Sequence, residues 1–173
     1  MNPFVATILV RVGLVLVIAV IVAVVLILLG TFSSQDAKIA EQITQDCDTT
    51  ICCKDCPAIK VSRIIDGDTF DSSAGRVRLY GVDTPERGER CFSEATDRLR
   101  ELVGGSVTVE TGPRLRDPFQ RNLYYIYTRS GESIDEKLVR EGFGRAWTRD
   151  GQHREVLVRL EQQVRQEGVG CLW

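Results

Sequence analysis

The short strand patterns and turn residues that follow Pro57 constrain the fold of this chain more than any other feature. The strand-like segments are residues 58–65, 69–72 and 76–82, separated by Asp66-Gly67 and Ser73-Ala74-Gly75. Such Asp-Gly and Ser-Ala-Gly sequences are typical of turns between strands. In the third segment Val77 and Leu79 alternate with Arg78, so the arginine is expected on the face opposite to the apolar side chains.

Helical and strand-like patterns then alternate along the rest of the chain. Apolar residues recur at helical spacing from Phe92 to Val103, and Gly104-Gly105 is expected to end this helix. Ser133 and Glu136 form a capping box at the start of a second helix, which stops near Gly142. The remaining segments are strands at residues 106–110 and 122–128 and a last helix at about residues 152–166. Five short strands interrupted by one helix predict an α+β fold, an OB-fold five-stranded β-barrel with three helices.

The N-terminal segment differs sharply from this domain. Residues 12–29 are apolar and uncharged, and a helix of about 20 apolar residues spans a bilayer. The length of this run favours an uncleaved transmembrane signal anchor at residues 1–32 over a cleaved signal peptide or a buried helix. Arg11 precedes the run and acidic residues follow it, so we expect a single-pass cell membrane protein whose following domain is extracytoplasmic.

A polar stalk is expected at residues 33–57, between the anchor and a domain at residues 58–173. The six cysteines of the chain are Cys47, Cys52, Cys53 and Cys56 in the stalk, followed by Cys91 and Cys171. Outside the cytoplasm, six cysteines most simply form disulfides. A bond between Cys91 and Cys171 would fix the C-terminal tail, and the other four would then pair in a pattern that the sequence does not define. A thiolate zinc site and redox exchange by Cys53 and Cys56 are the alternatives.

The charge composition limits how the chain could bind nucleic acid. A net charge of -2 argues against binding through bulk positive charge. The two signs balance in residues 57–173, however, and only Lys60 and Lys137 there are lysines. Arginine is the better bidentate partner for phosphate, although a mixed arginine-rich surface is an equally simple explanation.

Three short stretches hold the candidate site residues. Asp68 and Asp83 are carboxylates that could bind a hard cation, and the carbonyl of Thr84 could join them. The simpler structural alternatives are a turn at Asp66-Gly67 and a helix cap at residues 83–85. Oxygen ligands without a nearby histidine suit Ca²⁺ or Mg²⁺ better than zinc, since the single histidine, His153, falls in the last helix.

The other candidates are charged groups that suit phosphate chemistry. Arg78 and Arg121 could neutralise charge that develops on phosphate in a transition state, and each could equally be an ordinary surface arginine. Glu86 could orient or deprotonate an attacking water. We therefore predict catalytic roles for Arg78, Glu86 and Arg121.

Several motifs recur together, in one order, from about residue 58 to residue 173. They are Asp66-Gly67-Asp68-Thr69, Arg78-Leu79, Val82-Asp83-Thr84-Pro85-Glu86, the spaced residues Asp117, Arg121, Leu123 and Tyr125, residues 134–142, and Gly170-Cys171-Leu172-Trp173. Through these motifs the chain resembles the staphylococcal nuclease (thermonuclease) family.

The resemblance implies calcium-dependent hydrolysis of DNA and RNA, with little sequence specificity and 3′-phosphate ends. It implies that Asp68 and Asp83 are calcium carboxylates and that Thr84 supplies a main-chain carbonyl. It also implies that Glu86 is the general base and that the two arginines bind phosphate.

Some positions depart from the family pattern. Gln120 replaces a frequent glycine, Phe119 stands where tyrosine is common, and Trp147 occupies a region where the family has tyrosines. These changes bear on substrate binding and base preference, but they leave all six matched site positions intact. Two alternatives stay open: a catalytically inactive nucleic-acid-binding module, because a fold alone does not secure a function, and an envelope protein whose function resides in the clustered cysteines. The expected partners are a DNA or RNA substrate and the membrane, with a monomeric catalytic domain and no inferred protein partner.

Overall fold

The computed structural model describes residues 47–173. The predicted anchor at residues 1–32 and the stalk up to residue 46 lie outside the described residues. Within residues 47–173, none of the helices combines the length and the apolar character that crossing a membrane requires.

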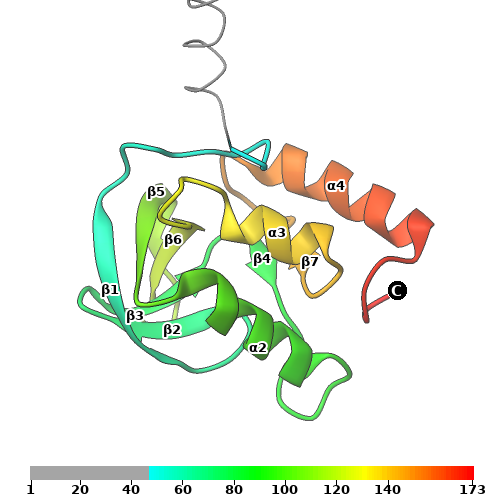
Figure 1. Cartoon of the computed structure of the whole chain (residues 1–173), viewed down its shortest axis with the longest axis horizontal. Helices are drawn as coiled ribbons and strands as arrows, with labels where there is room; N and C mark the ends of the chain where they lie inside the picture. Colours follow the sequence, from blue (N-terminus) through cyan, green and yellow to red (C-terminus); the bar gives the residue numbers. More distant parts are fainter. Residues whose placement is uncertain (1–46) are drawn as a thin grey trace, which may run out of the picture. The chain divides into compact units, whose positions relative to one another are not determined.

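Five strands form a closed β-barrel in the order β1-β2-β3-β6-β5 (Figure 1). All neighbours are antiparallel except β3 and β6, which run parallel. Two further strands, β4 and β7, pair with each other outside the barrel. The strands are β1 (Ala58–Ile64), β2 (Thr69–Ser72), β3 (Gly75–Leu79), β4 (Val82–Asp83), β5 (Ser106–Arg116), β6 (Asn122–Tyr127) and β7 (Arg145–Ala146). The closed five-stranded barrel is consistent with the predicted OB-fold.

The turn residues identified in the sequence do connect the first three strands. The Asp66 carboxylate accepts a hydrogen bond from the amide of Asp68 at 3.1 Å, which stabilises the turn between β1 and β2. Gly75 has a φ of 94°, a conformation that favours glycine, and it begins β3 directly after the second turn. These local signals therefore fixed the two hairpins.

The strand predicted at residues 76–82 is in fact two strands, β3 and β4, with a bend at Tyr80 and Gly81. The Gly81 amide donates a hydrogen bond of 2.7 Å to the buried carboxylate of Asp135. A Cβ at Gly81 would lie 2.5 Å from the Leu157 side chain. The tight packing under Gly81 therefore diverts the chain, which places β4 outside the barrel.

Three helices pack on the barrel: α2 (Phe92–Val103), α3 (Ile134–Arg140) and α4 (Arg154–Glu167). Helix α3 contacts β6 as well as α2 and α4 (Figure 1). Ser133 caps α3 by accepting a hydrogen bond of 3.1 Å from the Glu136 amide. The predicted capping box is only half formed, because the Glu136 carboxylate binds the amides of Thr50 and Ile51 instead.

Residues 47–57 belong to the same compact unit as the barrel. This unit begins at Cys47. Ile51 is buried in the core, and Glu136 is also buried while it accepts hydrogen bonds from Thr50 and Ile51 at 2.9 and 2.7 Å. The Cys53 amide donates a further bond to the Gly131 carbonyl at 2.9 Å. The part of the predicted stalk that the structure describes thus packs against α3.

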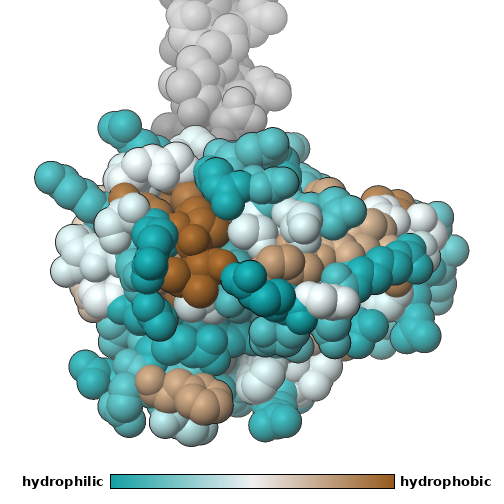
Figure 2. All heavy atoms as spheres, turned by 90° about the horizontal axis from the view of Figure 1, so that it is seen from below, coloured by the Kyte–Doolittle hydropathy of each residue, from teal (hydrophilic) through white to brown (hydrophobic). Residues whose placement is uncertain are grey.

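The prediction that the cysteines form disulfides is confirmed. The bonds are Cys47–Cys52, Cys53–Cys56 and Cys91–Cys171. The third joins the residue before α2 to the C-terminal tail across 80 positions of sequence. On the face drawn in Figure 2, hydrophilic residues predominate and surround a small hydrophobic patch.

Candidate active site

Asp68 occupies the last position of the turn that leads into β2, and it is 5% exposed. Its Oδ2 accepts hydrogen bonds from the amide and the hydroxyl of Thr84, at 2.9 and 3.0 Å. The turn lies so close to Thr84 that a Cβ at Gly67 would be 2.7 Å from the Thr84 hydroxyl. Glycine is therefore required here for the approach, and Asp68 joins the first hairpin to the end of β4.

Arg78 extends from β3 on the face away from the core, as the alternation predicted. Its Nη1 donates hydrogen bonds of 2.9 Å to the carbonyls of Leu79 and Val82. Its Nη2 forms ion pairs with Asp83 and, at 3.4 Å, with Asp68. The guanidinium thus lies between the two carboxylates that the sequence proposed as cation ligands, and it is 12% exposed.

Arg121 is positioned by Asp117, which the sequence had identified only as part of a motif. One carboxylate oxygen of Asp117 accepts hydrogen bonds from the amides of Phe119 and Arg121, both at 2.9 Å. The other accepts from Arg121 Nε at 2.5 Å. Burial raises the pKa of Asp117, but the Arg121 hydrogen bonds outweigh it and hold the pKa below its usual value.

Thr69 connects the two halves of the site, a role that the sequence did not indicate. Its hydroxyl donates to Asp68 Oδ1 at 3.0 Å and accepts from Arg121 Nη1 at 3.3 Å. Thr69 lies opposite Arg78 in the β2–β3 ladder and is buried. The second arginine is thereby linked to the first carboxylate through one hydroxyl group.

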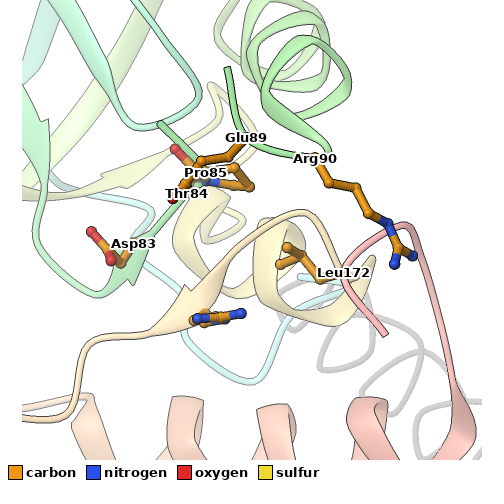
Figure 3. Close-up of a pocket in the computed structure, with 7 residues that line it drawn as sticks. Asp83, Thr84, Pro85, Glu89, Arg90 and Leu172 are labelled. Atoms are coloured by element: carbon orange, nitrogen blue, oxygen red, sulfur yellow. The ribbon is translucent and has the colours of Figure 1, made fainter. Parts of the chain in front are cut away.

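Two cavities meet at these residues. Arg78, Glu86 and Arg121 line a cavity of about 510 Å³, together with Trp147 and Phe119. Asp83 and Thr84 line a second cavity, of about 480 Å³ (Figure 3). Five of the six candidates predicted from the sequence therefore line one of the two cavities. The sixth, Asp68, contacts Arg78 of the larger cavity and Thr84 of the smaller one.

Negative charge accumulates near the turn. Burial raises the pKa of Asp66, and the neighbouring charges of Asp68 and Glu86 raise it further. Burial and repulsion of this kind disfavour ionisation, and a bound cation would relieve the repulsion. Asp66, which the sequence suggested only as a turn residue, therefore adds to the electrostatic field of the site.

The donors present suit a hard cation. In the described part of the chain, no three acidic, histidine or cysteine side chains form a metal-binding group. A cation at Asp68 and Asp83 would therefore draw its other ligands from the main chain and from water, which Ca²⁺ readily accepts. The Asp83 side chain is 54% exposed, so water reaches this position.

Aromatic side chains line the larger cavity. The Trp147 indole donates a hydrogen bond of 2.7 Å to Asp150, and the Arg78 guanidinium lies 5.9 Å from its ring. The Arg114 hydrogen bonds hold the pKa of Asp150 at about 2. The Phe119 ring is 79% exposed. His153 does not join the site and instead contacts Glu110 at 2.9 Å.

Comparison with known proteins gives consistent matches. A family model described as staphylococcal nuclease homologue matches residues 76–173. An uncharacterized endonuclease of Escherichia coli O157:H7 is 32% identical over 119 residues, which cover 66% of this chain and 75% of that protein. A thermonuclease of Staphylococcus intermedius is 34% identical over 97 residues, covering 50% and 57% of the two chains. A micrococcal nuclease of Shigella flexneri is 30% identical over 127 residues, covering 66% and 72%.

Proposed function

Because the chain belongs to the family of staphylococcal nuclease homologues, we propose that it is a calcium-dependent nuclease that hydrolyses DNA and RNA with little sequence specificity. The family membership confirms the resemblance drawn from the sequence motifs and implies a nucleic acid substrate. The calcium dependence, the 3′-phosphate products and the roles of individual residues are the proposed part.

The position of Arg78 is the observation that carries this proposal. It contacts both candidate cation ligands, Asp68 and Asp83, and it lines the same cavity as Glu86 and Arg121. This proximity supports the proposal, because a phosphate ligand, a base and cation ligands would have to lie close together for the reaction.

In the proposed reaction the chain's own groups bind and orient the phosphodiester. Arg78 and Arg121 bind its non-bridging oxygens and neutralise the charge that grows there in the transition state. Glu86 accepts a proton from water as the water oxygen bonds to phosphorus. The bond to the 5′ oxygen breaks, and this oxygen takes a proton from solvent and leaves as the 5′-hydroxyl, while the phosphate stays on the 3′ oxygen. Ca²⁺ held by Asp68, Asp83 and the Thr84 carbonyl would supply further positive charge.

We further propose that residues 1–32 anchor the chain in the cell membrane and that the nuclease domain lies outside the cytoplasm. The three disulfides support this location, because structural disulfides persist mainly in oxidising compartments. Protease added to intact cells should digest the domain. Full protection in sealed cells would reverse the proposed topology.

The test of activity uses the full-length chain purified in a mild detergent. Single-stranded DNA and RNA should be cleaved with Ca²⁺, and EGTA should stop the reaction. Arg78→Ala should lower kcat by about 10²–10³-fold. Arg63→Ala is the matched control, because Arg63 also pairs with an aspartate, Asp71, on the barrel but lines neither cavity. A folded chain without calcium-dependent cleavage that still binds oligonucleotides would instead identify a binding module.

A further inference from the structure

The smaller cavity contains two arginines that the proposed reaction does not use. We propose that Arg90 and Arg145 form a second phosphate subsite, which binds a backbone phosphate adjacent to the one cleaved. This inference rests on the proposed nuclease function and specifies the kind of substrate that the site takes, a polynucleotide strand rather than a single phosphodiester.

The first argument is position. Arg145 lies directly opposite Asp83 in the β4–β7 ladder, and both line the smaller cavity. Asp83 is in turn paired with Arg78, which lines the larger cavity. The two cavities therefore adjoin across one ion pair, so a strand held by Arg78 can continue into the smaller cavity.

The second argument is charge. Within residues 47–173, the guanidinium groups of Arg90 and Arg145 form no hydrogen bond or ion pair with a protein group, and both residues are exposed. The cavity's two carboxylates are already engaged, since Asp83 pairs with Arg78 and Glu89 accepts the Glu86 amide at 2.8 Å. Two guanidinium groups thus remain available for an anion, and guanidinium binds phosphate in a bidentate manner.

The third argument is that the Arg145 side chain and the backbone beside Arg90 are held in place. Arg145 lies over the Trp173 ring, 5.6 Å from its centroid, and Arg165 packs on the same ring at 5.4 Å. The Cys91–Cys171 disulfide fixes both the C-terminal tail and the residue that follows Arg90. In Figure 3, Arg90 and Leu172 belong to two segments that this bond connects. The cavity of about 480 Å³ is also within the size range of ligand sites, roughly 300–1,000 Å³.

The test compares a dinucleotide with an octanucleotide of single-stranded DNA, using the full chain with Arg90 and Arg145 both changed to Ala. A dinucleotide has one phosphodiester and cannot fill both cavities. The double variant should therefore raise KM for the octanucleotide about tenfold and leave the dinucleotide unchanged. The control is Arg129→Ala, which removes one arginine charge from an exposed position lining a different pocket and should alter the KM of neither substrate.

Binding is measured separately, by fluorescence anisotropy of a labelled octanucleotide in EGTA over a range of salt concentrations. Loss of two phosphate contacts on a single strand should reduce the slope of log affinity against log salt by about 1.4. If the wild-type chain cleaves neither substrate, the proposed nuclease function fails, while the binding slopes still decide on the subsite. Equal slopes for the wild-type chain and the double variant, or equal losses on the dinucleotide and the octanucleotide, would overturn the inference.

Discussion

Asp117 is expected to act only through Arg121, and Asp117→Asn tests this. The substitution keeps an oxygen that can accept the amides of Phe119 and Arg121, but it replaces the oxygen that holds Arg121 Nε with an amide group. The loop should therefore stay folded while the guanidinium loses its charged partner.

The magnitude follows from the contacts that are lost. Asp117 is 6% exposed and the Arg121 side chain 25%, so this ion pair is less screened than a surface pair. Loss of a charge-assisted hydrogen bond costs about 1.5–3 kcal/mol, and the freed Arg121 keeps only the bond to Thr69. Displacement of a catalytic group by about 1 Å can lower the rate by about 10²-fold. We expect kcat/KM to fall by about 10–100-fold.

The assay is calcium-dependent cleavage of single-stranded DNA by four chains: wild type, Asp117→Asn, Arg121→Ala and the double variant. If Asp117 works by holding Arg121, Asp117→Asn should have little further effect once Arg121 is alanine. Equal fold-losses in the two backgrounds would refute the reasoning. Far-ultraviolet circular dichroism checks that each chain is folded.

The other predictions concern stability and are measured by urea unfolding at 25 °C. Gln120 has a φ of 64°, so Gln120→Gly should relieve left-handed strain and stabilise the fold by about 1 kcal/mol; a loss of stability would contradict this. Glu136→Ala should destabilise by about 3–5 kcal/mol, because the buried carboxylate binds the amides of Thr50 and Ile51; a cost below about 1 kcal/mol would show that residues 47–57 are not held by it. Burial raises the pKa of Asp135 to about 6, so folding favours the protonated side chain. The stability gained from this protonation is fully present below about pH 4 and is lost as the pH rises through 6. Asp135→Asn should remove that part of the pH dependence, and an unchanged pH profile would rule it out.

Much of the fold could be predicted because its signals are local. The helix at Phe92–Val103 has the bounds that its apolar spacing and Gly104 indicated. Strand β2 also has its predicted bounds. Strand β5 is longer than predicted, however, and reaches Arg116, because pairing with β6 extends it past the point where its alternation fades.

The sequence by itself determined the types of residue at the site and their order along the chain. Motifs and turn residues depend on neighbouring positions, and these can be read without knowing the fold. Only the tertiary structure decided that Thr69 links Arg121 to Asp68 and that Arg145 lies opposite Asp83. The first of these contacts joins positions 52 residues apart, Thr69 and Arg121, and the second joins positions still further apart; the closure of the barrel and the register of the paired strands determine them. No local pattern in the sequence specifies a register between distant strands.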